Sequence, residues 1–297
     1  MRTSDPKASS NLSAYWQLTA TAAIWGFSWL CGRVISTEGI PAIHGALVRF
    51  SFGSLGLLAL MLLNRPWPRL TGKLAVRLAL MGFCGVFLYN LCFFNGLKTV
   101  PAGRASLVAS LQPSIVFLFS AIVWKERATV LRISGLFISL IGAAIVLSQG
   151  NPAALFAAGL NSGDLWILGC LFSWVAYTLL GRTVAGRLAP MASTAYSTWF
   201  GSLLLLMFGA LRPVAGVSWS AKAWMAAAFL GIFGTTTAFL LYLKGVGQLG
   251  ASRASVFINL VPVFGVLSAT FVLREPISAS TLIGGAAVVT GVRMLNR

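Results

Sequence analysis

Two stretches of the chain carry polar side chains at a spacing that places them on one face of a helix. Residues 103–113 read GRASLVASLQP and residues 252–262 read SRASVFINLVP. The positions at i, i+4 and i+7 are Ser106, Ser110 and Pro113 in the first stretch and Ser255, Asn259 and Pro262 in the second. Each proline also leaves a backbone carbonyl without its hydrogen bond. We expect these residues to bind a polar ligand, with the prolines as hinges; the alternative is serine-mediated helix packing.

Aromatic residues occupy a second pair of matching stretches, WGFSWLCGR from residue 25 and WVAYTLLGR from residue 174. The candidate ligand contacts are Trp25, Ser28, Trp174 and Tyr177, together with Tyr89 and Asn90 from a further apolar run. Indole and phenol rings provide apolar walls with one hydrogen-bond donor each. They suit a ligand that has both an apolar body and polar groups. The alternative for the tryptophans is a belt at the membrane interface.

Two basic side chains lie inside an apolar run, where burial of charge is costly and therefore indicates function. These are Arg49, within the run 42–63, and His44, near its start. Arg49 would meet a carboxylate of the ligand, or else bond a backbone carbonyl or reach the headgroups. His44 leaves a narrow route for proton coupling.

The five acidic residues all lie at or near the ends of apolar runs or outside them, at Asp5, Glu38, Glu126, Asp164 and Glu275. No carboxylate therefore remains mid-run to carry a proton or a sodium ion. Glu126 and Glu275 stand beside basic residues, so we expect them to form local ion pairs in turns. Arg104 and Arg253 begin their runs, and we expect them to anchor to lipid headgroups, with gating as the alternative.

The composition indicates an integral membrane protein. The 297 residues are 58% hydrophobic and 9% charged, against roughly 25% charged in an average soluble domain. Ten apolar runs, most of them close to the ~20 residues that a membrane-crossing helix needs, are found at 14–35, 42–63, 74–97, 102–124, 130–148, 165–184, 191–211, 222–244, 250–273 and 279–295. The fifth and tenth are shorter than the others.

The distribution of basic residues predicts the orientation. With the N-terminus inside, 15 of the 22 Lys and Arg residues fall on the cytoplasmic side and six on the other, as the positive-inside rule requires. We therefore expect a multi-pass protein of the bacterial inner membrane with both termini in the cytoplasm. The basic residues that give the net charge of +17 fall in short loops between the apolar runs. This distribution argues for the lipid bilayer as a partner and against nucleic acid.

An offset of 149 residues superimposes the two halves without a net gap. Trp, Arg, Pro, Glu and Gly residues match in order, including the Gly pairs Gly135/Gly142 and Gly284/Gly291, which are expected to pack helices closely. Because each half holds five runs, the second half enters the membrane from the opposite side. The expected domains are a first repeat at 1–148, a linker at 149–163 and a second repeat at 164–297.

Several of these motifs resemble the drug/metabolite transporter superfamily, EamA-type exporters. They are the paired Trp-to-Gly-Arg stretches, Arg-Ala-Ser leading to Pro, the turns KER and REP, and GDLWILGCLFSW at 163–174. Within the superfamily, the chain is most similar to the YddG-type amino-acid exporters. The resemblance implies an all-α fold of ten transmembrane helices in a 5+5 inverted repeat around a central cavity, with the fifth and tenth helices outside it. The small multidrug members use a first-helix glutamate, which this chain lacks.

We therefore predict an exporter of small organic metabolites, neutral or aromatic amino acids above all, that works by alternating access without obligatory carboxylate-based proton coupling. The alternatives are a proton-coupled exporter of other drugs or metabolites, a passive channel and, in a different class, an integral-membrane enzyme. An enzyme would need a nucleophile with a base or a cluster of metal ligands. We expect no enzymatic activity, no cofactor and no metal, and a monomer is sufficient because the chain holds both halves.

Overall fold

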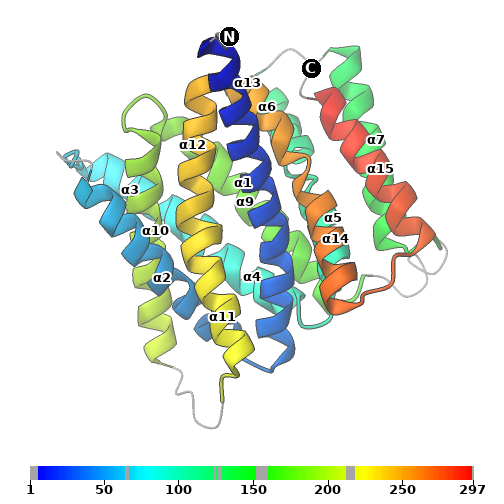
Figure 1. Cartoon of the computed structure of the whole chain (residues 1–297), viewed down its shortest axis with the longest axis horizontal. Coiled ribbons are helices and arrows are strands. Elements are labelled where there is room, and N and C mark those ends of the chain that lie inside the picture. Colours follow the sequence, from blue (N-terminus) through cyan, green and yellow to red (C-terminus); the bar gives the residue numbers. More distant parts are fainter. Residues whose placement is uncertain are drawn as a thin grey trace, which may run out of the picture.

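The computed structural model describes residues 6–63, 67–123, 125, 129–151, 160–211, 218–249 and 251–295, but not the side chains of 6–11, 251–253 and 255. These residues form helices and no β-strand. Nine helical spans in the described ranges are long and apolar enough to cross a membrane, and Ala279–Leu295 is a shorter apolar helix. The predicted all-α membrane fold is confirmed (Figure 1).

Six spans are single helices and four are composite. The single helices are α1 (Pro6–Thr37), α2 (Ala42–Leu63), α7 (Val130–Leu147), α9 (Ser162–Val184), α10 (Pro190–Ala210) and α15 (Ala279–Leu295). The composite spans are α3–η1–α4 (Gly72–Gly82, Phe83–Leu88, Tyr89–Gly96), α5–α6 (Ala102–Ala109, Gln112–Val123), α11–η2–α12 (Ala221–Phe229, Leu230–Thr237, Ala238–Leu249) and α13–α14 (Ala251–Ile258, Val261–Leu273). The short fifth and tenth runs correspond to α7 and α15.

The interruptions in the composite spans recur at the 149-residue offset. α5 gives way to α6 at residues 110–111, and α13 gives way to α14 at residues 259–260. Pro113 and Pro262 lack the N–H that would continue each helix, which explains both breaks. The wider π-helical turns of η1 and η2 also fall at equivalent positions in the two halves. The sequence duplication is therefore a structural one.

Contacts between the halves repeat as well. Gly96 of α4 packs against Ile167 of α9, and the equivalent Gly245 of α12 packs against Leu18 of α1. A side chain at either glycine would overlap its neighbour, so this approach of the helices requires glycine. The first and sixth spans thus lie against the third span of the opposite half, as expected for an inverted repeat with a pseudo-two-fold axis.

α7 and α15 pack against each other at one edge of the bundle (Figure 1). A Cβ on Gly135 would lie 2.6 Å from the Gly291 carbonyl oxygen, and one on Gly142 would lie 2.6 Å from that of Gly284. The glycine packing predicted from sequence is confirmed. α15 is less peripheral than expected, because its residues 289 and 292 line the central cavity described below.

The start of α1 and the end of α15 lie at the same end of the bundle, the top in Figure 1. We call this end the N-terminal side and the other end the opposite side. α5 begins and α14 ends on the opposite side, whereas α6 ends and α13 begins on the N-terminal side.

Candidate functional site

A cavity of about 450 Å³ lies between the two halves, beside both helix breaks. Small-molecule sites have volumes of roughly 300–1,000 Å³, so the cavity is large enough for a small organic compound. Every span except the one formed by α7 contributes to its lining within the described part of the chain. Most of the lining is apolar and aromatic, with amides, hydroxyls and one cation among it.

Most of the residues singled out in the sequence come together here. The cavity is lined by Trp25, Ser28, Arg49, Tyr89, Asn90, Ser106, Ser110, Pro113, Trp174, Tyr177, Asn259 and Pro262. His44 is buried in α2 and is not among the lining residues. Ser255 belongs to α13, and its side chain lies outside the described residues.

Other lining residues were not predicted, among them Phe50, Gln112, Thr194 and Thr198. Thr194 and Thr198 stand at i and i+4 in α10, the same spacing that identified the serines. Helical spacing could therefore have identified these two threonines as well. Gln112 directly precedes Pro113 in the interrupted span, where its position relative to the cavity depends on the direction of the kink. No sequence pattern reports that direction.

Aromatic rings form the walls, and most of them contact one another. The Trp25 Nε1 group donates to the Gly234 carbonyl at 3.1 Å, and its ring centroid lies 5.6 Å from that of Tyr242. Trp174, its repeat equivalent, lies 5.1 Å from the Tyr177 ring. Such clusters hold rings in fixed orientations, so the cavity presents preformed apolar surfaces on both halves.

The three described serines of the cavity use their hydroxyl protons within their own helices. Ser28, Ser106 and Ser110 each donate to a carbonyl three or four residues earlier, at 2.8, 2.8 and 2.6 Å. Ser106 also fills the space above Gly265, where a Cβ would overlap its hydroxyl. Packing and cavity lining therefore coexist at Ser106, and these hydroxyls offer acceptor lone pairs rather than donors to a ligand.

Arg49 brings a positive charge to the cavity from α2. One terminal nitrogen donates to Asn90 Oδ1 at 3.0 Å. Asn90 is fully buried, and its own amide nitrogen donates to the Val86 carbonyl at 2.7 Å. The guanidinium carbon lies 5.1 and 5.7 Å from the ring centroids of Phe50 and Phe93, close enough for cation–π attraction. The guanidinium is thus held in one orientation.

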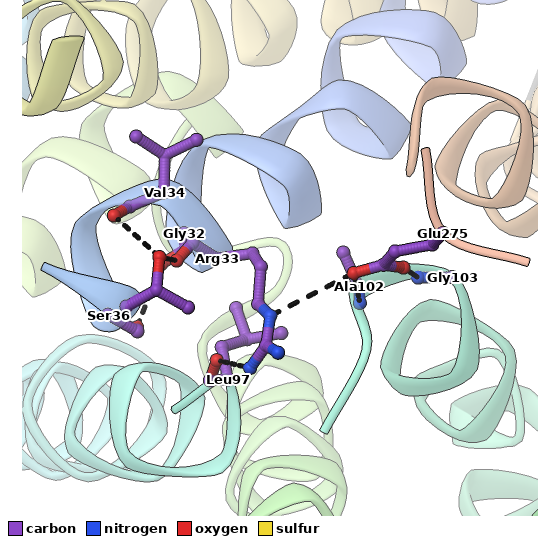
Figure 2. Close-up of polar contacts among 9 residues, drawn as sticks. Gly32, Arg33, Val34, Ser36, Leu97, Ala102, Gly103 and Glu275 are labelled. Carbon is purple, nitrogen blue, oxygen red and sulfur yellow. Dashed lines mark hydrogen bonds and ion pairs between the residues drawn. The ribbon is translucent and has the colours of Figure 1, made fainter. Parts of the chain in front are cut away.

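On the opposite side, Glu275 joins three segments that are distant in sequence. Figure 2 shows Arg33 of α1 reaching both the Leu97 carbonyl and the Glu275 carboxylate, with 3.8 Å between Arg33 Nε and Glu275 Oε1. The carboxylate also accepts from the backbone N–H groups of Ala102 and Gly103 at 3.1 and 3.3 Å. It thereby caps the N-terminus of α5, where a negative charge is favourable.

This arrangement corrects the expected local pairing of Glu275 in its turn. Its partners belong to the first and fourth spans, because the turn after α14 lies against α5 on the opposite side. The equivalent Glu126 lies outside the described residues.

Arg104 also differs from expectation. Its guanidinium lies 3.0 Å from the carboxylate of Asp164 and donates to the Leu147 carbonyl at 2.7 Å. The two charged side chains are 11% and 3% exposed, so Arg104 is buried in protein rather than anchored to headgroups. Asn161 Oδ1 accepts from the Asp164 N–H and caps α9. The pair ties the fourth span to the sixth on the opposite side.

The two ends of the cavity differ in their packing. On the opposite side α5 packs against α14, with Gly103 facing Val266. On the N-terminal side the repeat equivalents α6 and α13 are packed far less closely along their described lengths. The end of the cavity toward the opposite side is therefore the more tightly packed one, and the less tightly packed end faces the N-terminal side.

Known proteins share this architecture. The EamA-like transporter family model matches residues 12–148 and 161–297. The uncharacterized transporter YyaM of Bacillus subtilis is 30% identical over 222 residues, which are 74% of this chain and 72% of YyaM. The transporter YetK of the same organism is 26% identical over 95% of this chain and 86% of its own length.

A probable terminal-alkyne amino-acid exporter of Streptantibioticus cattleyicolor is 24% identical over 96% of this chain and 93% of its own length. A solved crystal structure superimposes with a TM-score of 0.65 over 94% of this chain and 97% of that one, at 24% identity, which supports the fold alone. Since the family model covers both halves and each half supplies five spans around one cavity, the chain is a multi-pass membrane transporter that belongs to the EamA-like transporter family.

Proposed function

We propose that this transporter exports small organic metabolites, above all amino acids with neutral or aromatic side chains, by alternating access of its two halves. The observation that carries the proposal is a cavity of about 450 Å³ between inverted repeats around which the helices pack more closely toward one side than toward the other. Exchange of the two halves' conformations would open it toward the other side.

The chemistry of the lining supports an amino-acid substrate. Tryptophan and tyrosine rings provide apolar walls, and the amides of Asn90, Gln112 and Asn259 offer donors and acceptors. The relative from Streptantibioticus cattleyicolor is described as a probable amino-acid exporter. The YddG-type assignment stays a prediction.

The direction of transport follows from the predicted orientation. With both termini in the cytoplasm, the less tightly packed end of the cavity would face the cytoplasm, which is the loading side for an exporter. The described lining contains no Asp or Glu, so the proposal includes no obligatory carboxylate-based proton coupling. The substrate would move down its own gradient.

Counterflow in proteoliposomes tests this function. Vesicles loaded with unlabelled phenylalanine or threonine should accumulate the labelled compound in a saturable way, and the accumulation should survive a proton uncoupler. A folded protein that gives no accumulation with either amino acid would contradict the amino-acid assignment. Accumulation that collapses with the uncoupler would contradict the absence of proton coupling.

A further inference from the structure

Arg49 is the only charged residue among the described residues that line the cavity. The ionisable groups that interact with its guanidinium are Tyr89, Cys31 and Cys170, whose ordinary pKa values leave them neutral at pH 7. No carboxylate in the described ranges lies within ion-pair distance of it. The cavity thus carries one uncompensated positive charge.

The hydrogen bonds of Arg49 are also incomplete. A guanidinium has five N–H donors, and the structure assigns one of them, to Asn90 Oδ1 at 3.0 Å. The Nε atom is buried and has no hydrogen-bond partner in the described part of the protein. Because the bond from Asn90 to the Val86 carbonyl fixes the amide, Asn90 holds one edge of the guanidinium and leaves further donors for another group.

A buried charge without a counter-charge is costly, and a planar guanidinium is suited to a carboxylate, which it binds through two parallel hydrogen bonds. We propose that Arg49, oriented by Asn90, is the anion subsite of the cavity, and that the transported compound carries a carboxylate on an apolar body. The inference rests on the proposed function only in placing the substrate in this cavity. The aromatic walls, including Trp25 and Trp174, would take the apolar body.

If Arg49 had only a structural role, it would need no ligand, because the rings of Phe50 and Phe93 and the amide of Asn90 would suffice to hold it. The two roles differ in what the purified protein binds. Four probes separate them: 3-phenylpropionate and L-phenylalanine carry a carboxylate, whereas phenethylamine and L-phenylalaninamide do not. Equilibrium binding of each probe, followed by calorimetry in detergent, is the measurement.

Wild-type protein should bind the two carboxylates at least about tenfold more tightly than their partners without one. Arg49→Gln should weaken carboxylate binding by about 10- to 100-fold, the range expected for hydrogen bonds to a charged group, and leave the amines nearly unchanged. Arg77→Gln is the matched control, because Arg77 lies in α3 away from the cavity and donates to the Thr183 carbonyl. It should bind all four probes as the wild type does.

Asn90→Asp is a second, independent variant that keeps the size of the side chain. It places a carboxylate where Asn90 Oδ1 now accepts from Arg49. The introduced carboxylate should then pair with the Arg49 guanidinium in place of the ligand, so carboxylate binding should fall by a similar factor. Equal binding of 3-phenylpropionate by the wild type, Arg49→Gln and Asn90→Asp would overturn the subsite. Failure of folded wild-type protein to bind either carboxylate would overturn it too.

The outcomes also separate this subsite from the proposed function. If 3-phenylpropionate binds through Arg49 and neither phenylalanine nor threonine shows counterflow, the subsite stands and the amino-acid assignment fails. If phenylalanine counterflow is the same in the wild type and in Asn90→Asp, the amino-acid function stands and the subsite fails.

Discussion

Arg33 and Arg182 occupy the same position in the two repeats, yet their surroundings differ. Arg33 lies on the opposite side, where it reaches the Leu97 carbonyl and the Glu275 carboxylate. Arg182 lies on the N-terminal side, is exposed, and donates to Ser120 Oγ at 2.8 Å. The same sequence position is therefore half-buried in one half and exposed in the other.

The helices around the two arginines show the same difference. α5 packs on α14, while α6 and α13, which are equivalent to α14 and α5 at the other end, pack far less closely in the described ranges. Since the two repeats share their motifs, the proposed function requires that each can adopt both packings. Exchange of these two packings is the movement that alternating access requires. Four sets of substitutions would break or sharpen this comparison, and the largest expected effect comes first.

Loss of Arg104 should destabilise the more tightly packed end most. Arg104→Ala leaves Asp164 buried without its partner, and breaking a buried ion pair in this way costs about 3–5 kcal/mol. Arg182→Ala, at an exposed position on the N-terminal side, should cost less than about 1 kcal/mol. Equilibrium unfolding of the purified protein in detergent measures both.

A double replacement, Arg104→Met with Asp164→Leu, should recover most of the stability, because neither charge is then left unpaired. If Arg104→Ala and Arg182→Ala cost the same, the two ends do not differ in the way that the structure indicates.

Removal of the Glu275 charge should loosen the packing on the opposite side without unfolding the protein. Glu275→Gln weakens the contacts to Arg33 and to the N-terminus of α5, and should increase access to the cavity from the opposite side by about tenfold, the equivalent of roughly 1.4 kcal/mol. The labelling rate of Ser110→Cys in a cysteine-free background, with an impermeant thiol reagent, reports this access.

Glu38→Gln is the matched control, because Glu38 is also a carboxylate on the opposite side but is exposed and bonds Ser220. An unchanged labelling rate in Glu275→Gln would show that Glu275 does not hold the cavity shut.

Trp25 and Trp174, which are equivalent tryptophans of the cavity lining, allow a comparison between the repeats. Trp174→Ala should raise KM for counterflow about tenfold by removing apolar contact with the substrate, while membrane insertion stays intact. Trp25→Ala should in addition lower stability, because it removes the bond to the Gly234 carbonyl. Trp224→Ala, at an exposed position, is the control. Unchanged kinetics in Trp174→Ala would remove Trp174 from the binding site.

The prolines should give the smallest effect. Pro113→Ala and Pro262→Ala each restore an N–H and favour a continuous helix, so the exchange between packings should slow by roughly two- to fivefold if the breaks act as hinges. The maximal counterflow rate should fall while KM stays constant. Wild-type rates in both variants would argue against the hinge role, which is a prediction here.

Much of the site was predictable because helical spacing determines which residues share a face. Ser106, Ser110 and Asn259 were found by that rule, and all three line the cavity. Gln112 was missed because it begins α6 directly after the break, and the sequence does not report the direction in which the span bends there. His44 was a candidate on the ground of its charge alone, and the structure buries it in α2 away from the cavity lining.

The ion pairs were predicted poorly for a related reason. Local pairing of Glu275 and headgroup anchoring of Arg104 are reasonable from neighbours in sequence, but the partners come from other spans, Arg33 and Asp164. Sequence proximity says little about charges at span ends, because five or more helix ends meet on each side of such a bundle.

By itself, the sequence determined the number and length of the spans, the duplication and its inverted topology. Lipid requires each crossing segment to satisfy its own backbone hydrogen bonds, so apolar length predicts a helix, and an odd number of crossings per repeat reverses the second copy. Only the tertiary structure decided which end of the cavity is more tightly packed and which partners the charges take. The repeated sequence does not distinguish the two ends, and the difference depends on contacts across the bundle between residues far apart in the chain.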